Sequence, residues 1–112
     1  MDITQEKQGN INIVKIKGRL DASTAGKLEE ALGEFINEDK IRVLVDCEVL
    51  DYISSAGLRV LLASAKELKK KNGKICLSAL NPNVKQVFEI SGFTSIFPIY
   101  ESTKDALADL AS

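Results

Sequence analysis

The segment Tyr52–Leu62, with the sequence YISSAGLRVLL, holds the residues whose types and spacing could do chemistry. Ser54 and Ser55 stand directly before an apolar helical pattern, so either hydroxyl could attack a substrate, cap a helix or accept a phosphate. The first turn of a helix has unpaired N–H groups and a partial positive charge, and it therefore accommodates a phosphate well. Ala56 and Gly57 are small enough to leave a hydroxyl accessible and to let another backbone come close. The residues alone leave open both a plain helix cap and a phosphate-acceptor or anion site.

A nucleophilic role for these serines lacks the partners that catalysis requires. The chain contains no histidine, which removes the Ser-His-Asp and Cys-His arrangements together. The pattern G-x-S-x-G is not matched, because Ile53 occupies the first glycine position. No serine is followed three residues later by a lysine that could act as its base. We therefore expect no catalytic residue and no enzymatic activity.

Other motifs for phosphate or metal binding are incomplete. The segment STAGKL has Asp21 where a P-loop would have its first glycine, and Leu28 where it would have Ser or Thr. Asp46, Glu48 and Asp51 lack the glycine turn of a calcium loop, and we expect them in a solvated connection between a strand and a helix. The sequence thus predicts no metal site and no cofactor.

Composition and charge are those of an ordinary globular domain. The 112 residues include 15 Lys or Arg and 16 Asp or Glu, for a net charge of -1. This balance argues against nucleic acid or an anionic membrane as the partner. The basic run Lys69–Lys71 is expected to end a helix, where cations oppose the negative end of the dipole. Cys47 and Cys76 lie in apolar runs without metal-binding spacing, and we expect two free buried thiols.

The chain shows no pattern that directs it into or across a membrane. No apolar run approaches the roughly 20 residues needed to span a bilayer, and the N-terminal stretch MDITQEKQGNIN lacks the pattern of a signal peptide. We expect a single cytoplasmic domain over residues 1–112 without direct membrane insertion. We expect a monomer when the protein is free, because nothing in the sequence demands a dimer.

The elements that must position the serines alternate between strands and amphipathic helices. Five strands are expected, at residues 3–6, 11–17, 41–47, 74–80 and 95–100. Four helices are indicated by apolar residues at helical spacing: Leu28, Ala31, Leu32, Phe35 and Ile36; Leu58, Leu61, Leu62, Ala65 and Leu68; Val84, Val87 and Phe88; and Leu107 and Leu110 within the closing stretch 102–112. The order β-β-α-β-α-β-α-β-α predicts an α/β domain with a small mixed central sheet, about four helices and right-handed crossovers. One face of the sheet should be more heavily covered than the other.

Several boundaries can be predicted from residue types. Asp21, Ser23 or Thr24 could cap the first helix. Gly73 is a good stop for the second helix, and Asn81 followed by Pro82 should begin the third. The phase of Ile11 and Ile13, opposite to that of Val14 and Ile16, indicates a bulge or burial on both faces. Pro98 favours an edge position for the last strand.

The chain resembles the anti-sigma factor antagonists, small bacterial proteins made of one STAS domain. The resemblance covers nearly the whole length and includes GRLDASTA (18–25), IRVLVDC (41–47), LDYISSAGLRVLL (50–62), NGKICLSALNPNVKQVFEISGF (72–93) and the final amphipathic helix. The block ending in S-S-A-G-L, placed between the right strand and helix, is the most specific part. The resemblance implies a STAS fold.

The resemblance also implies a partner switch. An unmodified family member binds an anti-sigma factor, itself a serine kinase with an ATP-binding domain, and so releases a sigma factor. The kinase phosphorylates a serine at this helix start, and a serine phosphatase reverses the modification. Alignment on Gly57 places the acceptor at Ser55, with Ser54 as the alternative because relatives have Asp at that place. The residues expected to contact the partner are Asp21, Ser23, Ser54, Ala56, Gly57 and Leu58.

Two other functions stay open on the sequence. The domain could be a fixed STAS subunit of a transporter-associated or signalling scaffold complex without a phosphorylation cycle. It could also bind a nucleotide or another small ligand at the same helix end.

Overall fold

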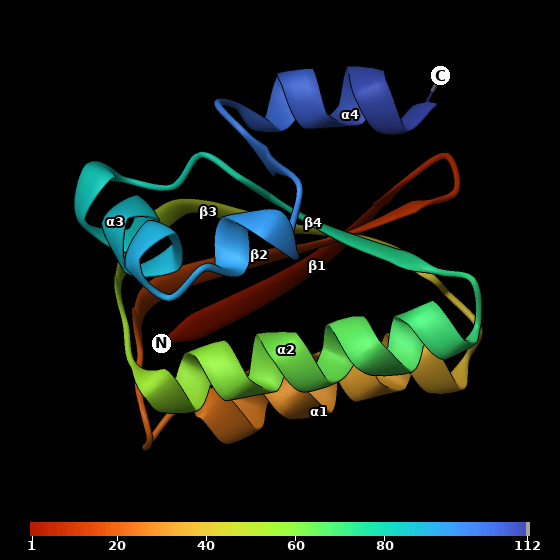
Figure 1. The fold of residues 1–112 in the computed structure, drawn as a ribbon. Helices are drawn as coiled ribbons and strands as arrows, with labels where there is room; N and C mark the ends of the chain where they lie inside the picture. The colour runs from red at the N-terminus through yellow and green to blue at the C-terminus, as the bar shows by residue number, and fades with distance from the viewer. Residues whose placement is uncertain (112) are drawn as a thin grey trace.

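The computed structural model describes residues 1–111, and these form one mixed five-stranded sheet in the order β1-β2-β3-β4-β5 (Figure 1). Strand β1 is antiparallel to β2, and the other neighbours are parallel. The strands are β1 (Asp2–Gln8), β2 (Ile11–Leu20), β3 (Arg42–Ile53), β4 (Lys74–Ser78) and β5 (Ile99–Tyr100). The helices are α1 (Ala25–Asn37), α2 (Ser55–Lys70), α3 (Pro82–Ile90), the short 3₁₀ helix η1 (Phe93–Ser95) and α4 (Thr103–Ala111). The predicted α/β order and mixed sheet are confirmed; Ser112, in the predicted closing stretch, lies outside the described residues.

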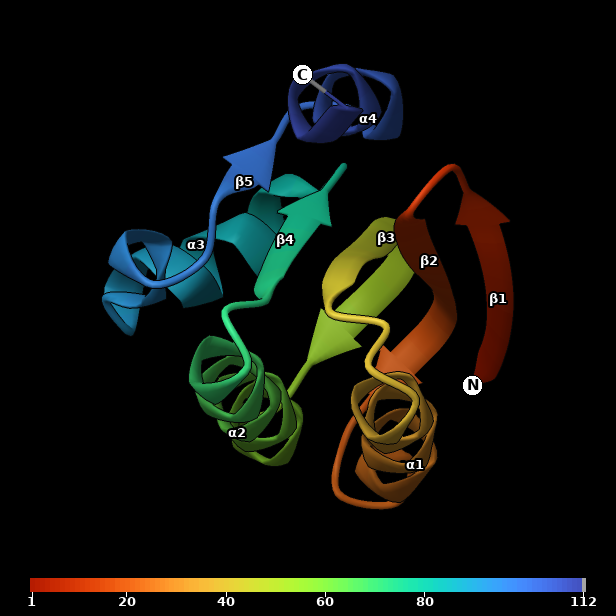
Figure 2. The ribbon, with the colours of Figure 1, turned by 90° about the vertical axis from the view of Figure 1, so that its right-hand side faces the viewer.

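The two faces of the sheet are covered unequally. Figure 2 shows α1 and α2 side by side on one face and α4 on the other. The larger core, on the side of α1 and α2, includes Leu28, Leu32 and Leu61, together with Phe88 from α3. The smaller core, under α4, contains Ile11, Ile13, Leu44, Cys76, Ala106 and Leu110. This confirms the expectation that one face is more heavily covered.

Strand β2 is buried on both faces along its first half. Ile11 and Ile13 belong to the smaller core, whereas Val14 and Ile16 belong to the larger one. Leu44 of β3 likewise faces the smaller core, between Val43 and Val45 that face the larger one. The continuous apolar runs in the sequence therefore reflect central strands covered on both sides. Of the two explanations offered for the Ile11–Ile16 pattern, two-sided burial is confirmed.

Strand β3 is longer than predicted, and the expected solvated connection over Asp46, Glu48 and Asp51 is wrong. These residues lie within β3, which runs on to Ile53 beside β2 with two register shifts. Each shift adds one residue to β3 and lets its side chains change phase without ending the strand. At the first shift, Asp46 is only 6% exposed and its carboxylate oxygen Oδ1 accepts a hydrogen bond from the Glu48 N–H at 3.0 Å.

Residues with left-handed backbone conformation end β4 and α2 at positions that differ from the predicted ones. Strand β4 ends at Ser78 rather than at residue 80, because Ala79 has φ of 59° and turns the chain out of the sheet. Helix α2 ends before Asn72, whose φ of 61° provides the left-handed stop predicted for Gly73. Gly73 is needed for space instead, because a Cβ atom there would lie 2.6 Å from the Ile41 carbonyl oxygen.

The last strand is shorter than predicted. The segment 95–100 was expected to be a strand, but only Ile99 and Tyr100 pair with β4, at the edge of the sheet. Before them, η1 turns the chain and buries Phe97 against Phe88 and Phe93, with ring centroids 6.0 and 6.1 Å apart. Aromatic packing of this kind outweighs the strand tendency of the segment. The edge position predicted from Pro98 is confirmed.

The two cysteines are free and buried, as expected. Cys47 lies in the larger core and Cys76 in the smaller one, so the sheet separates them. Burial raises the pKa of both thiols, which keeps them protonated and unreactive. Among residues 1–111, no group of three or more Asp, Glu or Cys side chains is placed to hold a metal ion.

Candidate functional site at the start of helix α2

The candidate site forms where β2 and β3 end at the same edge of the sheet. The strands are parallel, and Leu20 pairs with Ile53 at their carboxyl ends. The backbone N–H of Ser54 then donates to the Leu20 carbonyl oxygen at 2.9 Å. This bond joins the loop that follows β2, which carries Asp21, to the first residues of α2. The predicted residues of two distant segments therefore share one surface.

Ser54 is the N-cap of α2. Its backbone is extended, with φ of -100° and ψ of 174°, and its hydroxyl oxygen accepts a hydrogen bond from the Gly57 N–H at 3.4 Å. Its side chain is half-buried between the strand end and the helix. The hydroxyl of Ser54 thus has a structural task that the sequence allowed for either serine.

Ser55 is the first residue of α2 and is exposed. Its hydroxyl has no hydrogen-bond partner within residues 1–111. The first turn of α2 carries no acidic side chain of its own, so no residue within that turn offsets the partial positive charge of the helix end. The N-terminus of the helix itself would favour an anion attached at the exposed Ser55.

Gly57 and Leu58 lie beneath the surface. A Cβ atom at Gly57 would come within 2.6 Å of Leu20 Cγ and 3.1 Å of Ile53 Cγ1. The sequence suggested that this glycine lets another backbone approach, but the space is taken by Leu20 of the same chain. Leu58 is only 8% exposed and belongs to the larger core, and half-buried Ala56 packs against it. These residues seat α2 low against the sheet and so present Ser55 outward.

The loop after β2 is held by its own polar side chains. One Asp21 carboxylate oxygen accepts hydrogen bonds from the Ser23 hydroxyl at 2.7 Å and from the Ser23 N–H at 3.0 Å. These bonds, chiefly the one from the Ser23 hydroxyl, lower the pKa of Asp21 below its ordinary value despite partial burial. Asp21 is therefore negatively charged at neutral pH, beside the start of α2.

Of the three residues predicted as possible caps of α1, namely Asp21, Ser23 and Thr24, Thr24 is the N-cap residue, but its side chain does not make the cap bond. Its hydroxyl instead donates to the Arg19 carbonyl oxygen at 2.8 Å and accepts from the Asp21 N–H at 2.9 Å. The backbone carbonyl of Asp21 accepts from the Ala25 N–H at 2.8 Å, so the main chain does the capping. The polar side chains are thus used to shape the loop.

Arg19 and Tyr52 adjoin Asp21 at the same strand ends and were not predicted. The Arg19 guanidinium carbon lies 4.3 Å from the centre of the Tyr52 ring, and Arg19 Nε lies 3.8 Å from an Asp21 carboxylate oxygen. Tyr52 is 41% exposed and is one of three exposed large hydrophobic side chains within residues 1–111. The signal was present in the alternation of β3, since an inward Ile53 turns Tyr52 outward. Arginine and tyrosine are the residues most often found at the energetic centre of protein interfaces.

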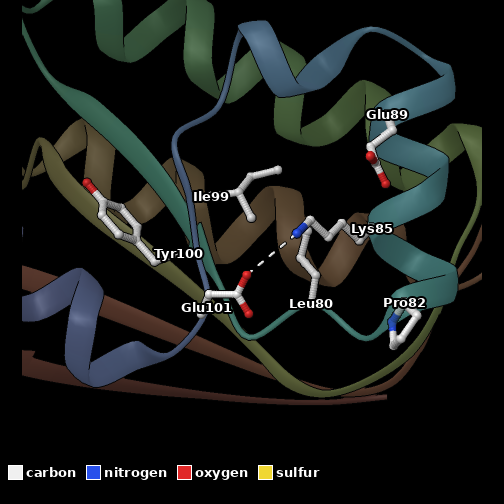
Figure 3. Close-up of a pocket in the computed structure, with 7 residues that line it drawn as sticks. All are labelled: Leu80, Pro82, Lys85, Glu89, Ile99, Tyr100 and Glu101. Carbon is white, nitrogen blue, oxygen red and sulfur yellow. Dashed lines mark ion pairs between the residues drawn. The ribbon is translucent and has the colours of Figure 1, made fainter.

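A separate recess lies between α3 and β5 (Figure 3). Lys85 reaches across it toward Glu101, with an Nζ to Oε1 distance of 3.7 Å, and Glu89 lies nearby. This mixture of charges gives the recess no preference for an anion or a cation. The surface around Ser55 is therefore the stronger candidate for the functional site.

Comparison with known proteins places these features in a family. The model of the STAS domain matches residues 2–106. BtrV of Bordetella bronchiseptica, which bears the name of an anti-sigma factor antagonist, is 43% identical over 108 residues, covering 96% of this chain and 93% of BtrV. The crystal structure of an anti-sigma factor antagonist from Mycobacterium paratuberculosis is 25% identical, covers 99% of this chain and 94% of that one, and superposes with a TM-score of 0.91.

A third similarity concerns the fold alone. The Bacillus cell fate determinant SpoIIAA, solved in its phosphorylated form, is 18% identical, covers 97% of this chain and 99% of that one, and gives a TM-score of 0.78.

No helix within residues 1–111 is long and apolar enough to cross a membrane.

Proposed function

The chain belongs to the STAS domain family, and from that premise we propose that it is a cytoplasmic anti-sigma factor antagonist that works as a partner switch. In its unphosphorylated form it binds an anti-sigma factor that is a serine kinase with an ATP-binding domain, and a sigma factor is released. Phosphorylation of Ser55 by that kinase abolishes binding. A serine phosphatase removes the phosphate and restores the binding form.

One observation carries the choice of Ser55. It is the first residue of α2, exposed, with a hydroxyl that has no partner in the described chain, whereas the hydroxyl of Ser54 accepts the Gly57 N–H. A kinase can reach the Ser55 oxygen without breaking a bond of the fold. Phosphorylation of Ser54 would remove the cap of α2 from its place between strand and helix.

The charge of the site explains why a phosphate would act on the partner rather than on the fold. Phosphate adds about -1.5 to -2 charges. The first turn of α2, which has no acidic side chain of its own, stabilises this negative charge through the helix dipole. A partner packed over Ser55 would instead bury a dianion next to the negative Asp21. A buried charge without a counter-ion costs about 3–5 kcal/mol, and about 1.4 kcal/mol corresponds to tenfold in affinity. A loss of two orders of magnitude or more is expected.

The proposed contact surface follows the exposed residues of the two joined segments. It comprises Asp21, Ser23, Ser54 and Ala56 together with Ser55, and the buried Gly57 and Leu58 support it from beneath. We add Arg19 and Tyr52, whose stacked side chains give this otherwise small-residue surface its largest exposed group. The phosphorylated form known for SpoIIAA, which has the same fold, supports a phosphate-controlled surface here.

Affinity capture from host lysate tests the proposal with three baits: the wild type, Ser55→Ala and Ser55→Asp. We expect a protein with a kinase-type ATP-binding domain to be retained by Ser55→Ala and lost by Ser55→Asp. Gln86→Asp is the matched control, because it adds the same charge at an exposed residue of α3 and should retain the partner.

Phosphate mapping by mass spectrometry on the protein isolated from cells completes the test. Modification of Ser55 in the wild type and its absence in Ser55→Ala would support the assignment. Equal retention of the partner by Ser55→Ala and Ser55→Asp would contradict it, and the same pair of substitutions would then be made at Ser54. Constant retention by both pairs would favour a fixed scaffold subunit.

A further inference from the structure

An apolar groove lies far from Ser55, between the second half of α2 and the segment that follows η1. Half-buried Leu62 and Ala65 of α2 line one side, and Ile96 and Pro98 line the other. Of the described large hydrophobic side chains, only three are clearly exposed, and Ile96 is one of them at 46%. We call this surface the α2 groove.

Three lysines surround the α2 groove. Lys66 and Lys69 of α2 and Lys74 at the start of β4 are all exposed and line it, and no acidic side chain does. None of the three forms an ion pair within residues 1–111, whereas the neighbouring Lys70 and Lys71 pair with Glu67 and Asp39. The groove therefore carries a local positive charge in a chain whose net charge is -1.

Helix geometry explains only part of this charge. Lys69 lies in the last turn of α2, where a cation is favoured by the helix dipole. Lys66 lies before that turn and Lys74 belongs to a strand, so neither has this structural reason. Two like charges three residues apart on one helix face, such as Lys66 and Lys69, weaken a helix slightly. A ligand that supplies negative charge would relieve that repulsion.

We propose that the α2 groove is a second docking surface, which receives an acidic segment of a partner protein with one apolar side chain seated between α2 and Ile96. Carboxylates on either side of that apolar residue would meet Lys66, Lys69 and Lys74. A groove lined by Leu62, Ala65, Ile96 and Pro98 can receive an apolar side chain, whereas a lipid surface would need a broader basic face. Charge complementarity thus selects an acidic protein segment.

The α2 groove is separate from the surface around Ser55. Lys66 lies eleven residues after Ser55 on the same helix, which is about 16 Å at 1.5 Å per residue. A partner bound at the groove could therefore stay attached when Ser55 is modified. The inference goes beyond the proposed switch and does not depend on it, since the groove is argued from residues that the switch does not use.

Titration with a designed peptide tests the inference directly. The probe is a capped peptide of about 12 residues with one central Leu flanked by Glu and Asp, added to the ¹⁵N-labelled protein. We expect amide shifts confined to residues around Leu62, Lys66, Lys74 and Ile96, with affinity in the range of about 1 mM. A peptide with Lys in place of Glu and Asp should cause no shifts.

Variants of the protein show whether the lysines of the α2 groove contribute to the affinity for the peptide or whether the peptide binds nonspecifically. Lys66→Gln and Lys74→Gln together should weaken binding at least about fivefold, because each removes an unpaired cation at the groove. Lys70→Gln should leave affinity unchanged, because Lys70 lies on the same helix but outside the groove. Ile96→Ala should weaken binding by removing the exposed apolar contact.

Three outcomes would overturn the inference. The first is the absence of shifts at 5 mM peptide, and the second is binding that survives the double lysine substitution. The third is stronger perturbation of the same residues by phosphatidylglycerol vesicles than by the peptide, which would identify a lipid surface instead. Phosphorylation at Ser55 enters none of these measurements, so the groove and the switch can fail independently.

Discussion

The backbone N–H of Ser54 lies 2.9 Å from the carbonyl oxygen of Leu20 and donates a hydrogen bond to it. This one bond crosses from the end of β3 to the end of β2. It brings the start of α2, which presents Ser55, beside the loop that carries Asp21. The geometry of the candidate site depends on this junction more than on any side chain in it.

The cap of α2 should depend on the Ser54 hydroxyl. We expect Ser54→Ala to lower the free energy of unfolding by about 0.5–1 kcal/mol, toward the lower end of cap losses because the Ser54–Gly57 bond is long at 3.4 Å. Ser54→Asp should restore the lost stability, since Asp is an equally good cap and its charge suits the helix start. Urea denaturation measures both. An unchanged free energy of unfolding in Ser54→Ala would show that the hydroxyl does not cap α2.

Gly57 should tolerate no side chain. The Cβ atom of Gly57→Ala would lie 2.6 Å from Leu20 Cγ, so either Leu20 or α2 must shift. We expect a loss of about 1–3 kcal/mol in the free energy of unfolding. Gly33→Ala is the matched control, because Gly33 lies inside α1 with nothing within 4 Å, and it should gain up to about 1 kcal/mol. A neutral Gly57→Ala would contradict the close packing of α2 on Leu20.

A negative charge at Ser55 should leave the fold intact. We expect Ser55→Asp to raise the free energy of unfolding by about 0.3–1 kcal/mol, because it adds the first acidic side chain to the first turn of α2. Ser91→Asp places the same charge at the C-cap of α3 and should lower stability, because the dipole is reversed there. If Ser55→Asp unfolded the protein in thermal denaturation, its loss of partner binding would have to be ascribed to misfolding.

The stacked pair of Arg19 and Tyr52 should matter for partner binding. Exposed cation–π pairs contribute only about 0.5–1 kcal/mol to a fold, so Tyr52→Ala should change the free energy of unfolding little. Against the captured kinase, we expect Arg19→Ala or Tyr52→Ala to weaken affinity at least tenfold, as for residues at an interface centre. Lys104→Ala is the control, because Lys104 is exposed on α4 and lies outside the proposed contact surface. Unchanged affinity for Tyr52→Ala in calorimetry would remove this pair from the interface.

The loop after β2 should lose stability in acid. The pKa of Asp21 in the fold is lowered below its ordinary value of 3.8, mainly by the Ser23 hydroxyl. A lowered pKa means that the carboxylate stabilises the fold fully above that ordinary value, and that the contribution disappears as pH falls through the folded pKa. The difference in free energy of unfolding between the wild type and Asp21→Asn should therefore be constant near neutral pH and shrink below about pH 4. A difference that does not change with pH would mean that the Asp21 charge does not contribute.

The sequence by itself determined the elements and their order. Long apolar patterns, such as Leu28 to Ile36 and Leu58 to Leu68, identify helices because an amphipathic face must be buried, and this requirement is local in sequence. The cap formed by Asn81 before Pro82 was predictable for the same reason, because its signal is also local. The side-chain oxygen Oδ1 of Asn81 accepts a hydrogen bond from the Val84 N–H at 2.8 Å. The sequence also placed Ser54 and Ser55 at a strand-to-helix junction. It did not predict which of the two caps the helix and which is exposed.

Only the tertiary structure decided which serine caps and which is exposed, because that depends on how α2 is seated on Leu20. The same holds for β3, which continues through Asp46 and Asp51 since β2 offers it partners that no local pattern reveals. Arg19 and Tyr52 lie 33 positions apart in the sequence and meet through strand register. Local sequence fixes which backbone conformations are favoured. Contacts between distant segments decide which polar groups are used up inside the molecule and which are left for a partner.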